Sequence, residues 1–142
     1  MAKRSLAVFF ARVTLGLIFF MAGWWKVFEL GSVEHARRMF VEPYADTWIP
    51  AALLWASGAA VPVIELLAGA LLIVGWRIRE ASIALGAVLL LVTYGHLLKE
   101  PLYSFTGHVI PRLGLLIFVL WVPREEDRLS VDHWHARRRK AH

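Results

Sequence analysis

The sequence predicts an all-α protein, an integral membrane four-helix bundle with both termini cytoplasmic and a short interfacial helix between helices 1 and 2. The chain of 142 residues is 58% hydrophobic, with a mean hydropathy of +0.56, whereas a soluble domain is about half apolar. Its apolar residues gather into runs long enough to cross a bilayer. Lysine and arginine collect in the segments that would lie on one side of the membrane. We therefore expect one membrane domain over residues 1–142, in contact with lipid.

Four apolar stretches are expected to cross the membrane. They cover residues 6–30, 51–76, 80–98 and 107–122. The first follows Lys3 and Arg4, as the apolar core of a signal peptide would. It is too long for a signal peptide, however, contains Arg12 and lacks a small-residue cleavage site, so we expect it to be retained. The fourth stretch is short and carries three polar or helix-restricting residues near its start: His108, Pro111 and Arg112.

The connection over residues 32–50 has helical periodicity in its first half. Its apolar residues recur on one side, namely Val33, Ala36, Met39 and Phe40, and its polar residues fall on the other, namely Glu34, His35, Arg37 and Arg38. This pattern predicts a short helix in the membrane interface that ends near Pro43.

The distribution of basic residues predicts the orientation of the bundle. Cytoplasmic segments would hold ten of them: Lys3, Arg4, Arg77, Arg79, Arg124, Arg128, Arg137, Arg138, Arg139 and Lys140. Outer loops would hold three: Arg37, Arg38 and Lys99. This asymmetry places both termini, including the basic tail 123–142, in the cytoplasm. The basic residues that set this orientation also explain the net charge of +5. Because the charge then needs no other explanation, we expect no nucleic-acid partner.

Small and polar residues follow one stripe on each of the first two helices. The stripe on the first contains two glycines between two cations, in the order Arg12, Gly16, Gly23 and Lys26, which indicates close packing against other helices. The second helix carries Gly58, Glu65 and Gly69 in a similar stripe. Pro62 also lacks the N–H group that would bond the Gly58 carbonyl.

Arg12 and Glu65 are expected to form an ion pair in the inner half of the membrane. A charge at the centre of a membrane helix costs about 2.5–3.5 kcal/mol to insert, so it normally finds a partner. At about 1.5 Å per residue, Arg12 and Glu65 lie at similar depth in their helices. The pair could be purely structural, or it could handle protons.

A second group of candidate residues is expected near the outer surface, where the first and third helices end and the fourth begins. Lys26, His96, His108 and Arg112 fall at this height, with Tyr94 and Tyr103 nearby, and we take the first four as candidate ligand-binding residues. Lys26 could instead extend to the lipid headgroups without binding a ligand. His96 and His108 could be axial haem ligands, but two histidines without a motif do not predict a metal site.

The chain contains no cysteine, which excludes disulfides, thiol redox centres and thiolate metal sites. It also carries no self-contained catalytic motif, so no catalytic residue can be named. Any redox chemistry would depend on a bound cofactor, a lipid-soluble carrier or another subunit.

Several of these residues resemble the DoxX family of small four-helix membrane proteins. The stretch from Arg12 to Lys26, RVTLGLIFFMAGWWK, is similar to the opening of that family. The same holds for Glu65-Leu66-Leu67 with Gly69, for His96, and for Pro111 and Ser130-Val131-Asp132. The chain departs from the family where members carry Glu-Tyr and this sequence has His108-Val109-Ile110.

The resemblance implies a multi-pass protein of a bacterial cytoplasmic (inner) membrane. Some family members are subunits of thiosulfate:quinone oxidoreductase, and others accompany oxidoreductases or thiol-stress systems. Our leading hypothesis is a membrane subunit of a redox system that binds a quinone headgroup or a similar small ligand within the bundle. The alternative is a non-catalytic accessory or scaffolding subunit that holds other membrane proteins in a larger complex. A transporter is less favoured, because the sequence shows no inverted repeats.

Overall fold

The computed structural model describes residues 2–123 and 125–139, and this part of the chain is all-α, as predicted. Two of the basic residues used for orientation, Arg124 and Lys140, lie outside the described residues. The α-helices and short π-helices (η) follow in the order α1 (Ala2–Trp24), η1 (Trp25–Glu29), α2 (Ser32–Ala36), η2 (Arg37–Val41), α3 (Ala51–Val74), α4 (Ile78–Lys99), α5 (Val109–Trp121) and α6 (Val131–Arg139).

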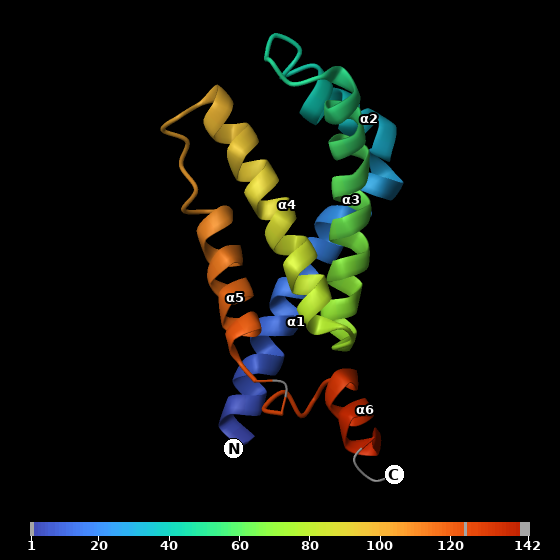
Figure 1. Cartoon of the computed structure of the whole chain (residues 1–142), viewed down its shortest axis with the longest axis vertical. Helices are drawn as coiled ribbons and strands as arrows, with labels where there is room; N and C mark the ends of the chain where they lie inside the picture. The colour runs from blue at the N-terminus through green and yellow to red at the C-terminus, as the bar shows by residue number, and fades with distance from the viewer. Residues whose placement is uncertain (1, 124, 140–142) are drawn as a thin grey trace.

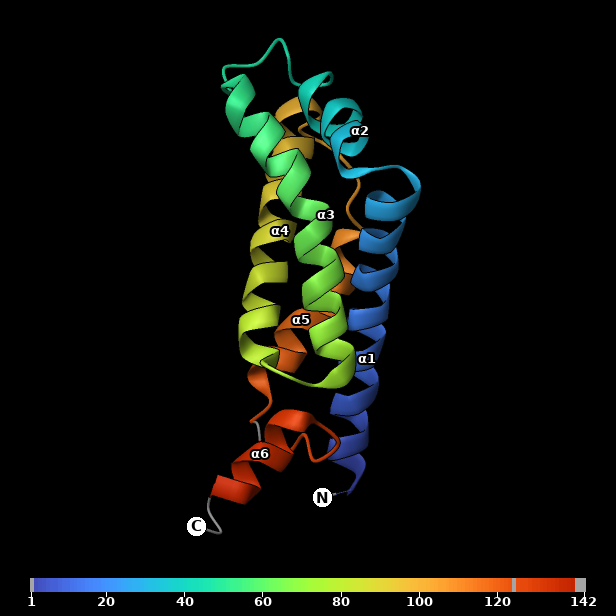
Figure 2. The same ribbon diagram turned by 90° about the vertical axis from the view of Figure 1, so that its right-hand side faces the viewer.

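The helices α1, α3, α4 and α5 run along the long axis of the molecule (Figures 1 and 2). α2 lies at one end, and α6 lies at the other end, where α1 begins. Figure 1 shows that α3 and α4 diverge toward the α2 end, while the loop after α4 turns back along the molecule before α5 begins. The start of the first described helix and the last described helix therefore lie at the same end of the molecule.

Three helical segments are long and apolar enough to cross a membrane: Lys3–Glu29, Ala51–Val74 and Ile78–Lys99. They coincide with the first three predicted spans to within a few residues. α3 ends two residues early because Gly75, with φ 78°, adopts the left-handed conformation that caps a helix.

α5 is a shorter apolar helix of 13 residues, in place of the predicted span 107–122. His108 precedes it with a non-helical φ of −122°. Val122 follows it in an extended conformation, because Pro123 disfavours helical geometry in the residue before it.

α2 and η2 form the predicted helix between the first two spans and end at Val41, close to Pro43. The predicted polar and apolar faces are wrong at two positions. Val33 is 71% exposed, whereas His35, expected on the polar side, is 3% exposed. The cause is a hydrogen bond from His35 to α3, which belongs to the cavity described below.

Three glycines bring the backbones of α1 and α3 into contact. A Cβ atom on Gly23 would lie 2.4 Å from the backbone nitrogen of Leu66, and one on Gly69 would lie 2.5 Å from that of Phe20. A Cβ atom on Gly16 would lie 2.9 Å from the Gly69 carbonyl oxygen. Because no side chain fits in these spaces, the glycine stripes are a packing face, as predicted.

Arg12 is completely buried and joins three parts of the chain at the α6 end. Its Nε donates to Asp127 Oδ2 at 2.9 Å, and its Nη2 donates to the Leu129 carbonyl at 3.0 Å. Its Nη1 donates to the carbonyls of Leu72 and Ile73, the latter at 2.9 Å. The guanidinium therefore links α1 both to the last turn of α3 and to the segment between α5 and α6.

The predicted Arg12–Glu65 ion pair is wrong, although both side chains are buried. Arg12 lies beside the last turn of α3, where carbonyl groups are available to accept hydrogen bonds. Glu65 lies about two turns, or roughly 10 Å, from that turn and pairs with Lys26 instead. Asp127, which follows α5, supplies the carboxylate that Arg12 requires. Burial raises the pKa of Asp127, and the positive charge of Arg12 opposes that rise.

The segment after α5 also caps α4. The Asp132 carboxylate accepts hydrogen bonds from the backbone N–H groups of Arg77 and Ile78, each at 3.0 Å. Its own N–H donates to the Gly75 carbonyl at 3.0 Å. The first amides of a helix have no acceptor within it, so a carboxylate placed there stabilises the helix start.

Replacing Gly69 with alanine is expected to destabilise the protein by about 1–3 kcal/mol, because the α1 and α3 backbones must separate. SDS unfolding titrations would measure the loss. The matched control is Gly114→Ala in α5, where an added Cβ meets nothing within 4 Å. Equal stability of the two variants would contradict the packing described here.

Asp127→Asn is expected to destabilise the protein by about 3–5 kcal/mol, because it leaves the buried Arg12 charge without a carboxylate. Glu126→Gln is the control, since Glu126 pairs with the exposed Arg4 and its loss should cost less than about 1 kcal/mol. The same SDS titration compares the two. A similar small loss for both variants would show that the buried pair does not hold the segment after α5.

Candidate ligand-binding cavity

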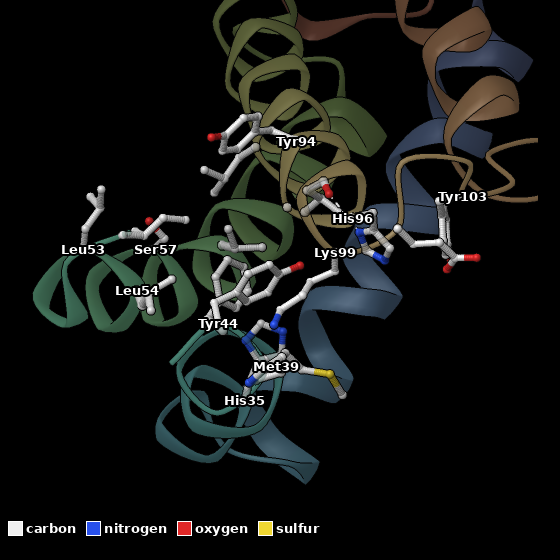
Figure 3. Close-up of a pocket in the computed structure, with 18 of the residues that line it drawn as sticks. His35, Met39, Tyr44, Leu53, Leu54, Ser57, Tyr94, His96, Lys99 and Tyr103 are labelled. Atoms are coloured by element: carbon white, nitrogen blue, oxygen red, sulfur yellow. Dashed lines mark hydrogen bonds between the residues drawn. The ribbon is translucent and has the colours of Figure 1, made fainter. Parts of the chain in front are cut away.

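A cavity of about 540 Å³ lies at the α2 end, where α3 and α4 diverge (Figure 3). Its volume falls within the range of small-molecule sites. Aliphatic and aromatic side chains predominate in its lining, among them Trp25, Phe40, Tyr44, Trp48, Leu53, Leu54, Val61, Leu91, Tyr94 and Tyr103. The polar residues that line it are Lys26, His35, Ser57, His96, Lys99 and Glu100. This is the composition expected of a pocket for a largely apolar ligand with a few polar groups.

Two helices supply the walls through residues at helical spacing. Leu53, Ser57 and Val61 recur every four residues on α3, and Leu91, Gly95 and Lys99 do so on α4. Figure 3 shows side chains from both helices and from the α2 region around the same space.

The loop after η2 closes one side of the cavity. The Tyr44 hydroxyl lies where it would come within 3.0 Å of a Cβ atom on Gly95. Lys99 Nζ lies 5.8 Å from the centroid of the Tyr44 ring and donates to Asp46 Oδ1 at 2.6 Å. These contacts join the loop to the end of α4.

Lys26 lines the cavity from η1 and forms a close ion pair with Glu65 of α3. Its Nζ lies 2.6 Å from Glu65 Oε2, and the two side chains are 22% and 6% exposed. The π-helical turn, closed by the bond from Leu30 N to the Trp25 carbonyl at 2.9 Å, is a wider turn that often occurs at functional sites. The predicted inward position of Lys26 agrees with this arrangement, and its partner differs from the prediction.

A hydrogen bond from His35 holds α2 against α3. Pro62 has no N–H for the Gly58 carbonyl, and His35 Nδ1 donates to that carbonyl instead, at 2.8 Å. Gly58 permits the approach, since a Cβ atom there would lie 2.6 Å from Ala36 Cα. Burial lowers the pKa of His35 and the nearby Lys26 charge lowers it further, against the effect of the Gly58 hydrogen bond.

His96 also lines the cavity, as expected of a candidate ligand-binding residue. Its Nδ1 donates to the Val92 carbonyl at 2.8 Å, one turn earlier in α4. The Tyr103 ring packs on its imidazole, with ring centroids 4.4 Å apart. These two contacts fix the orientation of the imidazole.

The other two predicted members of the outer cluster do not line the cavity. His108 is exposed just before α5. Arg112 lies in α5, with its guanidinium 5.7 Å from the centroid of the Phe19 ring. The cluster is divided because the loop after Lys99 turns back along the molecule before α5 begins (Figure 1), which places Arg112 beside Phe19 of α1. His96 and His108 therefore do not share the cavity as a haem-ligating pair would, and among the described residues no group of three or more histidine and acidic side chains suits a metal ion.

Sequence reasoning missed His35, Tyr44 and Lys99 as parts of the site. The signal for His35 was present, because Pro62 frees the Gly58 carbonyl and a donor on the neighbouring short helix could reach it. No comparable signal pointed to Tyr44, whose position depends on the path of an irregular loop.

The family model described as DoxX matches residues 7–97, which extend from α1 nearly to the end of α4 and include most of the cavity lining. The match stops before Pro111 and the Ser130-Val131-Asp132 segment. Neither the curated proteins nor the solved structures contain a match to the chain.

The lowered pKa of His35 predicts a pH dependence of stability. In the unfolded chain His35 has the ordinary histidine pKa of about 6.5. In the folded state its pKa is lower, so the unfolded chain binds the proton more readily. The free energy of unfolding should therefore fall as the pH drops below about 6.5, by up to about 1.4 kcal/mol per pH unit. His35→Asn keeps an amide donor for Gly58 without a titrating group, so its stability should fall less between pH 7.5 and 5.5. Identical pH profiles in SDS titrations would contradict this assignment.

Proposed function

This chain belongs to the DoxX family, and on that premise we propose that it is a membrane subunit of a redox system that binds a quinone headgroup, or a similar small ring, in its cavity. The cavity is the observation that carries the proposal. It has room for a ring, a mostly apolar lining and polar groups from two elements, namely Lys26 from η1 and His96 and Lys99 from α4. A quinone requires an apolar slot and a few polar partners for its two oxygens.

The described polar groups suit the two ends of such a ring. Lys26 and Lys99 each use one ammonium hydrogen for a carboxylate and retain others that can donate to a ring oxygen. Leu53, Leu54 and Leu91 line the apolar part of the cavity and suit an isoprenoid tail. Trp25 and Tyr44 offer aromatic faces for contact with the ring.

In the proposed membrane arrangement, α5 is the fourth span and both termini are cytoplasmic, in a bacterial inner membrane. The excess of basic residues in the segments at the α6 end supports this orientation. The location of α1's start and α6 at one end of the molecule (Figure 2) agrees with an even number of spans. The cavity, with α2 beside it, then lies at the outer membrane surface.

The binding proposal can be tested by tryptophan fluorescence, since two of the seven tryptophans, Trp25 and Trp48, line the cavity. Titration of the purified protein with a short-chain quinone should quench this fluorescence saturably. Ser57→Trp, which fills the cavity from α3, should weaken binding at least about tenfold, because it takes the space of the ring.

His108→Ala should leave quinone binding unchanged, since His108 is exposed outside the cavity. Circular dichroism and gel filtration would establish that each variant is folded. Unchanged affinity in folded Ser57→Trp would contradict the placement of the ligand. An absence of quinone binding, together with co-purifying membrane proteins, would favour the accessory-subunit alternative.

A further inference from the structure

Two histidines that line the cavity have the same hydrogen-bonding arrangement. His35 Nδ1 bonds to the Gly58 carbonyl and His96 Nδ1 bonds to the Val92 carbonyl, each at 2.8 Å. A carbonyl oxygen can only accept, so each Nδ1 must carry the hydrogen. In the neutral imidazole the other nitrogen, Nε2, then has a lone pair and can only accept.

Neither Nε2 atom has a hydrogen-bond partner among the residues that the structure describes. Both imidazoles line the cavity, from different elements: His35 from α2 and His96 from α4 (Figure 3). Burial and the nearby Lys26 lower the pKa of His35, which favours its neutral form. The cavity therefore contains two acceptors whose ring orientations are fixed by backbone carbonyls.

Each cationic donor at the cavity already donates to one carboxylate and keeps further ammonium hydrogens. Lys26 donates to Glu65 and Lys99 donates to Asp46, each at 2.6 Å. A ring carbonyl could accept a hydrogen bond from either ammonium group. Beside an imidazole Nε2, however, the lone pairs of the carbonyl oxygen and of Nε2 would face each other with no hydrogen between them. A ring hydroxyl can accept from the ammonium and also donate to Nε2, so it satisfies both partners.

We infer that the cavity selects the reduced, hydroxyl-bearing form of its ring ligand, a hydroquinone, through acceptance of its hydroxyl hydrogens by Nε2 of His35 and His96. This inference rests on the proposed function, since it specifies which redox state of a quinone-type ligand the same cavity prefers. One or two neutral hydrogen bonds correspond to about tenfold tighter binding of the hydroquinone than of the quinone.

The test compares three ligands of the same ring size on the purified protein in detergent at pH 8, under anaerobic conditions. They are a short-chain quinone, its hydroquinone and the corresponding dimethyl ether, which has no hydroxyl hydrogens. Calorimetric titration should give the tightest binding for the hydroquinone and about tenfold weaker binding for both others. Equal affinity for hydroquinone and dimethyl ether would overturn the inference.

Asparagine variants separate the two ring nitrogens. His96→Asn keeps a donor near the position of Nδ1 and removes Nε2, so the preference for hydroquinone should fall while quinone affinity remains. His35→Asn should act in the same way, and His96, which is the less buried of the two, provides the test if the His35 variant does not fold. His108→Asn is the matched control and should keep the full preference.

The two proposals fail in different ways. Binding of both redox states with equal affinity, or a preference that survives in His96→Asn, would overturn the selection of hydroquinone and leave quinone binding in place. An absence of binding by all three ligands would overturn the proposed function, and the inference with it.

Discussion

The contact between the backbones of α1 and α3 determines which charged groups can meet. Gly23 lies against Leu66 and Gly16 lies against Gly69, which fixes the antiparallel register of the two helices. In that register Arg12 reaches the last turn of α3, and Lys26 reaches Glu65 near the cavity. The energetic cost of the buried Arg12 and the partly buried Lys26 is offset by carboxylate and carbonyl partners that the glycine contact brings into range.

Much of the fold could be predicted from local patterns, because membrane helices need long apolar runs and helix packing in lipid needs small residues. The predicted inward stripe was right for Arg12, Gly16, Gly23 and Lys26. The pairing of Arg12 with Glu65 was wrong, because it relied on distance from helix ends, which are uncertain. The glycine contacts predict the relative depth of two residues better, since helices in backbone contact cannot slide far past each other.

The remaining errors arose where tertiary contacts override local periodicity. His35 is polar and was assigned to the solvent side. It is buried because it donates to the Gly58 carbonyl of α3, which has no helical donor since Pro62 lacks an N–H group. α5 begins farther from the α2 end than its sequence suggested, and this separates His108 and Arg112 from Lys26 and His96. Sequence periodicity predicts which face of a helix is buried. It does not predict where along the molecule the next helix begins after a long loop.

The bonds that Asp132 makes to Arg77 and Ile78 have a consequence for how the chain is made. The start of α4 depends on a carboxylate synthesised about fifty residues later. In a nascent chain that ends before Asp132, the N–H groups of Arg77 and Ile78 would thus lack this acceptor until the ribosome has finished the segment after α5. The first turn of α4 therefore receives its stabilising carboxylate only after α5 and the segment that follows it have been made.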